Sequence, residues 1–208
     1  MKVEPAHVGA VVVDSLPYSQ GGTDAQAIGL KAAGVAAMAG YLGVVSAARL
    51  AGILAAGLAF IPVTLAGEYN DGPNDEIAQL HALGIPLGAS VFLDLEGLSA
   101  FKSDPVALAA KVNAWADAIA AAGFVPCLYV GVPQPFTSAE LYALRVRGYW
   151  RGQGSIRDRM NVLAEPTSAG WMMTQVYPSR NAGNPATWVD FNMIGQDYKG
   201  RVPQWVVS

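Results

Sequence analysis

The stretch LAAGLAFIPVTL, residues 54–65, joins the end of one structural element to the whole of the next. Small, helix-favouring residues lead to Gly57, and an apolar run follows as far as Leu65. Glycine is favoured just beyond the last turn of a helix, because it adopts a left-handed backbone without steric cost. A short apolar run is typical of a strand that is covered on both faces. The stretch therefore predicts a helix, a glycine stop and a buried strand.

The same pattern recurs along the first two thirds of the chain. It is repeated in KAAGVAAMAGYL (31–42), AAAGFVPCLYVG (120–131) and the variant HALGIPLGASVFLDLE (81–96). Helix starts agree with it, because Ser46, Asn74 and Asp104 are residue types that cap helix N-termini, and Pro105 suits the first helical position. Alternating helices and strands predict parallel strands joined by crossover helices.

Eight strands are predicted, and eight suggests that the sheet closes on itself. They lie near residues 8–14, 35–41, 58–65, 89–96, 124–131, 147–151, 171–177 and 187–193. The fold class is therefore α/β: a single TIM-like barrel domain over residues 1–208, with eight mostly parallel strands. An open, doubly wound sheet is the alternative, but no G-x-G-x-x-G motif follows the first strand.

The predicted barrel has an incomplete helix ring in its C-terminal third. A full (β/α)₈ barrel takes about 250 residues, and this chain has 208. The clear helical patterns lie before residue 124, and TSAELYALRV (137–146) is a shorter helix candidate. The last two crossovers are rich in Gly, Pro, Asn and Ser, which predicts loops.

Composition narrows the function classes. Hydrophobic residues make up 52% of the chain and charged residues 14%, which predicts a large apolar core. The net charge is −3 and no Lys/Arg cluster is present, which disfavours nucleic acid and anionic membrane surfaces as partners. Cys127 has no second cysteine to pair with, and two histidines leave little for a zinc site or a Ser-His-Asp triad.

A membrane protein is a weaker reading of the apolar segment 27–67. Lys31, Arg49 and several glycines interrupt this segment where a spanning helix would need continuity. The first residues, MKVEPAHVGAVVVD (1–14), contain too short an apolar run for a signal peptide. We therefore expect synthesis in a cytoplasm without a signal peptide, and no membrane association.

Carboxylates gather where several predicted strands end. In ASVFLDLEG (89–97), Asp94 and Glu96 share one face of the strand because alternate residues point the same way. Asp14 closes the first predicted strand, and the last predicted strand ends likewise at Asp190. In a closed barrel, these four side chains are expected to converge at the carboxyl end, where barrel enzymes build their active sites.

Such a cluster suits acid/base chemistry at a glycosidic bond. Neighbouring carboxyl groups separate one another's pKa values, so one stays protonated while another is ionised. Hydrolysis of a glycosidic bond uses that pair of states. The alternatives are a divalent-cation site, acids that cap loops, and unrelated surface charges. No loop has metal-ligand spacing, so we expect no metal and no cofactor.

Several motifs resemble the glycoside hydrolase family 25 lysozymes and related glycoside-hydrolase-like domains, including domain of unknown function 1906. The family has an Asp that closes strand one, a D-x-E that closes a central strand, and a late VDxN. The matching segments are VVVDS (11–15), FLDLE (92–96) and WVDFN (188–192), with lesser echoes in CLYVG (127–131), GYWRG (148–152) and WMMTQVY (171–177). The chain departs from the family at IPVTLAGEYN (61–70), which lacks the usual Tyr-His-Phe-like segment.

The resemblance implies a lysozyme of muramidase type, which cuts the link between N-acetylmuramic acid and N-acetylglucosamine in peptidoglycan. By that likeness Glu96 is the general acid, and Asp94 assists as base or stabilises the charged intermediate. Asp14 and Asp190 complete the catalytic set. The residues implied to hold sugar rings are Tyr129, Trp150 and Gln175.

The implied partners are peptidoglycan glycan strands, and we expect a monomer. Without a signal peptide, disulfides or wall-binding repeats, the chain suits a phage endolysin that reaches the wall after release, although a bacterial origin is equally compatible. The alternative function is a non-catalytic carbohydrate-binding or wall-associated domain on the same barrel. Release of reducing sugar ends from peptidoglycan distinguishes the two.

Overall fold

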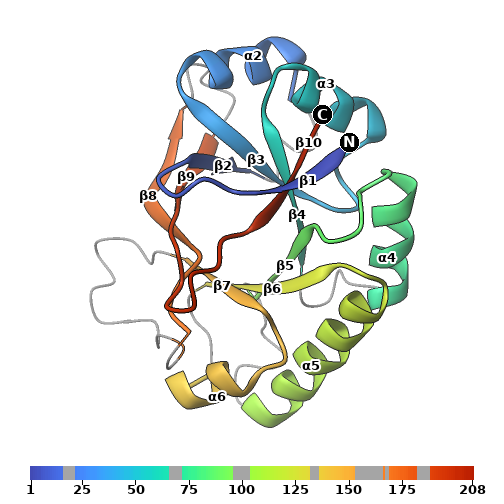
Figure 1. Ribbon diagram of the computed structural model, residues 1–208, viewed down its shortest axis with the longest axis vertical. Coiled ribbons are helices and arrows are strands. Elements are labelled where there is room, and N and C mark those ends of the chain that lie inside the picture. The colour runs from blue at the N-terminus through green and yellow to red at the C-terminus, as the bar shows by residue number, and fades with distance from the viewer. Residues whose placement is uncertain are drawn as a thin grey trace.

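A closed barrel of eight strands forms the centre of the protein (Figure 1). The computed structural model describes residues 1–15, 22–65, 72–95, 104–131, 136–152, 166, 169–181 and 188–208, and of residues 177–181 and 188 only the backbone. The barrel strands, each bonded to the next and β9 to β2, are β2 (Val11–Asp14), β3 (Val35–Tyr41), β4 (Ala59–Leu65), β5 (Ser90–Asp94), β6 (Val125–Val130), β7 (Gly148–Arg151), β8 (Met173–Asn181) and β9 (Trp188–Ile194). The predicted α/β barrel is confirmed.

Strand β9 runs against its neighbours. Every other neighbouring pair in the barrel is parallel, whereas β9 is antiparallel to both β8 and β2. Residues 182–187 join β8 to β9, and a parallel crossover needs about a dozen residues or more. Asp190 was expected at the carboxyl end of its strand, which is wrong, because it lies near the start of β9. It still reaches the carboxyl end of the barrel because β9 is reversed.

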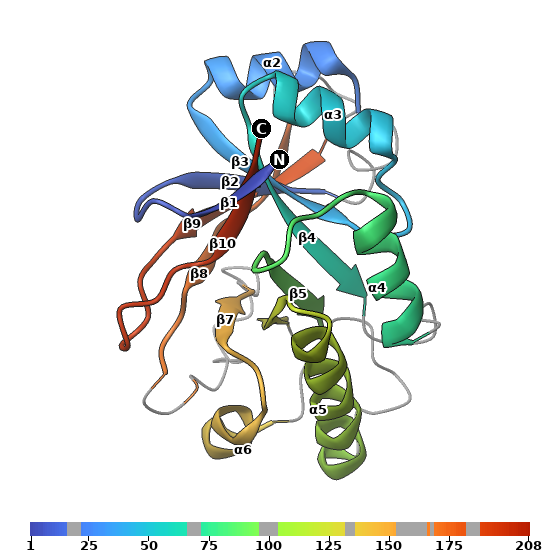
Figure 2. The ribbon, with the colours of Figure 1, turned by 45° about the vertical axis from the view of Figure 1, so that its right-hand side comes forward.

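Two further strands, which the sequence did not predict, cover the amino end of the barrel. Strand β1 (Lys2–Pro5) pairs antiparallel with β10 (Gln204–Val207), and β10 reaches β4 through Val206 opposite Phe60. Both strands lie across the barrel in two views (Figures 1 and 2). Trp205 packs into the barrel interior from this side. The two strands pair with each other from opposite ends of the chain, and the alternation of residues along a sequence does not reveal such a pairing.

Five helices form an arc around the outside of the barrel (Figure 1). They are α2 (Asp24–Ala32), α3 (Ala47–Ala55), α4 (Pro73–Ala82), α5 (Pro105–Ala121) and α6 (Ser138–Ala143). All five precede β7, so within the described residues the helix ring is incomplete in the C-terminal third, as predicted. None of the helices in the described part of the chain is both long and apolar enough to span a membrane.

Helix ends follow the glycine pattern read from the sequence. The residues just beyond four helices have φ of 88°, 78°, 68° and 88°, namely Gly34, Gly57, Gly84 and Gly123. Ser46 and Asp104 cap α3 and α5 as expected, because their side chains accept hydrogen bonds from backbone amides three residues later. The prediction that Asn74 is a helix N-cap is wrong. Helix α4 begins at Pro73, whose fixed φ suits the first helical position, and Gly72 is its N-cap.

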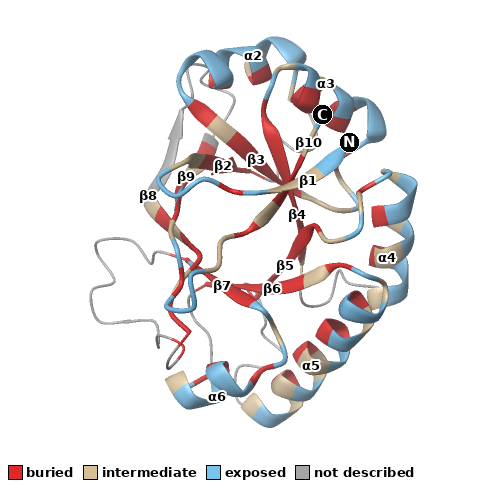
Figure 3. Cartoon of the chain, viewed as in Figure 1, coloured by how far each residue is buried: buried red, intermediate tan, exposed pale blue. Residues whose placement is uncertain are grey.

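Two apolar layers hold the fold together, one outside the barrel and one inside it. Outside, α5 buries Leu108, Val112, Trp115 and Ile119, which lie three or four residues apart on one face of the helix, against the strands. Inside, inward-facing strand residues such as Phe92 pack together. Figure 3 shows the buried residues concentrated on the strands and on the inner faces of the helices. The alternation of strand side chains therefore fills both layers.

Replacing Asp104 by Ala is expected to reduce the free energy of unfolding by about 1 kcal/mol, because the N-cap of α5 is lost. The Asp104 carboxylate accepts a hydrogen bond of 2.9 Å from the Ala107 amide. Denaturant unfolding measures the change. Asp104→Asn is the matched control and should keep most of the stability, since asparagine caps nearly as well. An alanine variant as stable as the parent would contradict the capping role.

Candidate active site

Two buried carboxylates lie at the carboxyl end of the barrel. Asp14 ends β2 and Asp94 ends β5, and their relative exposures are only 7% and 3%. Val12 and Phe92, two residues earlier on the same strands, belong to the interior cluster. Because strand side chains alternate with a period of two, both carboxylates point into the barrel. Their burial has to be compensated by hydrogen bonds or charges.

Asp94 receives a hydrogen bond from a tyrosine on another strand. The Tyr41 hydroxyl, at the end of β3, donates to Asp94 Oδ2 over 3.1 Å. A donated hydrogen bond favours the ionised form of a carboxyl group. The sequence reading missed Tyr41, although its spacing from Ala39 and Ala37 on the inward face of β3 was visible in the sequence.

Asp14 is held by an asparagine that the sequence reading also missed. Asn192 Nδ2 donates to Asp14 Oδ2 over 2.6 Å, and Trp150 Nε1 donates to Asn192 Oδ1 over 2.9 Å. Asn192 is fully buried. The signal was present in WVDFN, because Asn192 shares the inward face of its strand with Asp190.

Asp190 lies directly opposite Asp14. The two residues are partners in the antiparallel pairing of β9 with β2, and side chains of directly opposed residues project on the same face. Asp190 is half-buried. The structure therefore brings Asp14 and Asp190 together, and it places Asp94 at the same end of the barrel.

Tyr129, Trp150 and Gln175, which are predicted to hold sugar rings, form one buried group at the level of the carboxylates. The ring centroid of Tyr129 lies 4.5 Å from that of Trp150, and the Tyr129 hydroxyl donates to Gln175 Oε1 over 3.4 Å. Trp150 also meets Phe92 edge to face at 5.7 Å. These contacts link β5, β6, β7 and β8 at the level of the carboxylates. Contact of the three residues with sugar stays a prediction.

Glu96, the residue predicted to be the general acid, lies outside the described residues. The described part of this segment ends at Leu95, which is buried and whose amide donates to the Tyr129 carbonyl over 3.2 Å. The role of Glu96 as the general acid stays a prediction. Within the described segments, no group of three or more His, Cys, Asp or Glu side chains is arranged to hold a metal ion.

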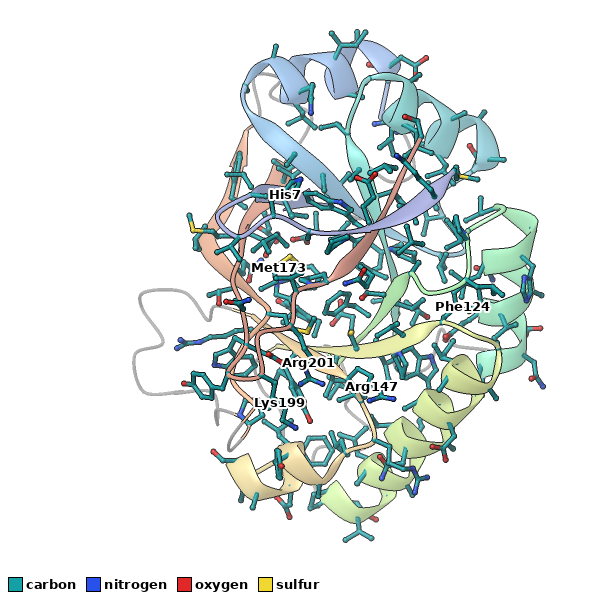
Figure 4. The ribbon with its side chains drawn as sticks, viewed as in Figure 1. His7, Phe124, Arg147, Met173, Lys199 and Arg201 are labelled. Carbon is teal, nitrogen blue, oxygen red and sulfur yellow. The ribbon has the colours of Figure 1, made fainter. Side chains whose placement is uncertain are left out.

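Apolar packing lies below the carboxylates. Cys127 precedes Tyr129 by two residues on the inward face of β6 and is fully buried. Burial raises the pKa of its thiol to about 12, mainly because the thiolate would lose its hydration. Met173, from β8, is also fully buried in this interior cluster and is labelled in Figure 4. These buried, mainly apolar side chains form the floor of the candidate site.

A separate hollow of about 230 Å³ lies at the other end of the barrel. Its lining includes Glu4, His7, Lys31 and Trp205, which come from the amino-end elements. His7 lies edge-on to Trp205, with ring centroids 5.6 Å apart. Opposite charges line this hollow, and none of the candidate site residues that the structure describes borders it.

Comparison with solved structures shows the same barrel in glycoside hydrolases. No family model and no curated protein matches the sequence. A muramidase from Trichobolus zukalii is 14% identical, with a TM-score of 0.62 and coverage of 89% of this chain and 93% of that chain. A Streptococcus pneumoniae virulence factor described as a glycosyl hydrolase 25 is 10% identical, with a TM-score of 0.59 and coverage of 89% and 87%.

The same fold also occurs without an assigned activity. An uncharacterised protein from B. stearothermophilus is 17% identical, with a TM-score of 0.66 and coverage of 90% of this chain and 96% of that chain. At these identities, the likenesses show the fold alone. The chain thus has a glycosidase-like barrel, and its chemistry has to be argued from its own residues.

The Cys127 thiol is expected to resist alkylation in the native protein. Its pKa of about 12 keeps it protonated at about pH 8, and burial blocks access. Iodoacetamide labelling followed by intact mass should show no adduct in buffer and one adduct in concentrated guanidinium chloride. Rapid labelling of the folded protein would show that the barrel floor is open to solvent.

Proposed function

We propose that the protein is a peptidoglycan glycosidase of muramidase type. The observation that carries the proposal is the pair of buried carboxylates, Asp14 and Asp94, which face the barrel interior at its carboxyl end beside a group of aromatic side chains. Asp190 adds a third carboxylate opposite Asp14. The barrel likeness to a muramidase and to a glycosyl hydrolase 25 supports this class of substrate.

The proposed reaction divides the work between two carboxyl groups. Glu96 donates its proton to the glycosidic oxygen as the bond to the anomeric carbon breaks, so that the leaving sugar departs as a neutral alcohol. Water then adds to the anomeric carbon and gives up a proton to Glu96, which restores the acid. Asp94 stays ionised, helped by the Tyr41 hydroxyl, and stabilises the positive charge that develops on the sugar ring. The apolar floor around Phe92 and Cys127 lowers the local dielectric and strengthens that attraction.

The proposed substrate is the glycan strand of peptidoglycan, cut between N-acetylmuramic acid and N-acetylglucosamine by a monomer without cofactor. Acetylated sugars carry many hydroxyl and amide groups, and aromatic rings with carboxylates recognise both their C–H faces and their polar edges. An endolysin that acts on the wall after release from a cytoplasm is the setting that we propose.

Glu96→Gln is expected to lower the release of reducing ends from purified peptidoglycan at least about a hundredfold, because the variant cannot donate a proton. Glu4→Gln is the matched control. It removes a carboxylate from β1, at the opposite end of the barrel, and should keep the parental rate. Mass spectrometry of the digests identifies the bond that is cut, and thermal melting shows whether each variant folds.

Two outcomes would contradict this function. If Glu96→Gln digests peptidoglycan at the parental rate, Glu96 is not the acid. If the parent binds peptidoglycan but releases no sugar ends from any wall type, a carbohydrate-binding or wall-associated domain replaces the enzyme.

Tyr41→Phe is expected to lower turnover about ten- to a hundredfold, because a hydrogen bond to an ionised group is worth roughly 1.5–3 kcal/mol. Tyr142→Phe is the control, because Tyr142 lies half-exposed on α6. The variant keeps the aromatic ring, whose centroid lies 5.7 Å from Lys199 Nζ. Initial rates of wall lysis measure both. Equal rates for Tyr41→Phe and the parent would remove Tyr41 from the reaction.

A further inference from the structure

A chain of hydrogen bonds runs through the barrel from Trp150 to Asp14. Trp150 on β7 donates to Asn192 on β9, and Asn192 donates to Asp14 on β2, over 2.9 and 2.6 Å. Trp150 is 1% exposed and Asn192 fully buried. These hydrogen bonds therefore link three strands, and Asn192, the middle residue, has no access to bulk water.

The direction of this chain is fixed by chemistry. An indole N–H can only donate, so the oxygen of the Asn192 amide has to face Trp150. The amide nitrogen, which can only donate, then has to face Asp14. Asn192 Nδ2 also lies 3.4 Å from the backbone carbonyls of Val12 and Asp190, which are acceptors and hold the amide the same way round. The amide cannot flip without losing these bonds.

Asp14 is consequently presented with a fixed donor. A carboxyl oxygen that accepts this short hydrogen bond is favoured in its ionised form, because donation to the charged group is stronger than donation to the neutral acid. Because the Asn192 amide is held by Trp150, the Asp14 oxygen is held in one orientation as well. Asp14 is thereby suited to accept hydrogen bonds and unsuited to donate a proton.

We propose that Trp150 and Asn192 are positioning residues, which hold Asp14 as an oriented carboxylate that accepts a hydrogen bond from a substrate hydroxyl or acetamido N–H. Proton donation is thereby left to another carboxyl group of the site. This role rests on the proposed glycosidase function. A buried Trp150 can have this role, because its indole N–H acts on Asp14 through Asn192 and does not have to contact the substrate.

Trp150→Phe tests the first link, because it keeps an aromatic ring and removes the N–H. We expect kcat/KM for peptidoglycan fragments to fall about tenfold, the effect of one lost hydrogen bond in a charged network. Trp205→Phe is the matched control. It makes the same change at a buried tryptophan whose indole nitrogen meets no hydrogen-bond partner within the described structure. That variant should stay within about twofold of the parent.

A double-mutant cycle separates positioning from general damage to the fold. Asn192→Leu alone should also lower kcat/KM about tenfold. In the Asp14→Asn background, it should add less than about twofold, because both changes act through Asp14. In ¹H–¹⁵N spectra, Asn192→Leu should move the indole resonance of Trp150, identified by its loss in Trp150→Phe, and leave that of Trp205 in position.

The outcomes distinguish this proposal from the function on which it rests. Additive losses, or a Trp150→Phe variant as active as Trp205→Phe, overturn the positioning role while the glycosidase stands. An unmoved Trp150 resonance in Asn192→Leu overturns the hydrogen-bond chain itself. A parent that releases no sugar overturns the glycosidase and with it the role of Asp14. In that case, a moved resonance would still report the Trp150–Asn192 bond.

Discussion

The antiparallel pairing of β9 with β2 is the contact on which the site depends. It closes the barrel, sets Asp190 opposite Asp14, and sets Asn192 opposite Val12. A shift of one residue would turn Asn192 to the outside and leave the Asp14 carboxylate buried without its amide donor. The register of this one pair therefore determines both the closure of the sheet and the polarity of its carboxyl end.

The buried carboxyl groups at this end accept hydrogen bonds from neutral side chains that are far away along the sequence. Asp94 uses the hydroxyl of Tyr41, and Asp14 uses the amide of Asn192. Taking a carboxylate out of water is costly unless hydrogen bonds replace its hydration. Both of these donors are uncharged side chains.

Much of the fold was readable from the sequence because it is encoded locally. Helix ends at glycines such as Gly57 and the inward face of β5 depend on neighbours within a few residues. The direction of β9 and the existence of β1 and β10 depend on partners far along the chain, which periodicity does not reveal. Asp14 and Asp94 were predicted as site residues because each follows an apolar run in its own strand. Tyr41 and Asn192 were missed. Each of these two matters only through a partner on another strand.

Strand β10 adds a consequence for the growing chain. Residues 204–207 are synthesised after all eight barrel strands, and they pair both with β1 and with the Phe60 end of β4. Until they emerge from the ribosome, β1 lacks the one partner that it has among the described strands, and that edge of β4 stays open. Open edges of this kind pair readily with other chains. We therefore expect the nascent protein to stay prone to aggregation until β10 has paired with β1 and β4 and Trp205 has packed into the amino end of the barrel.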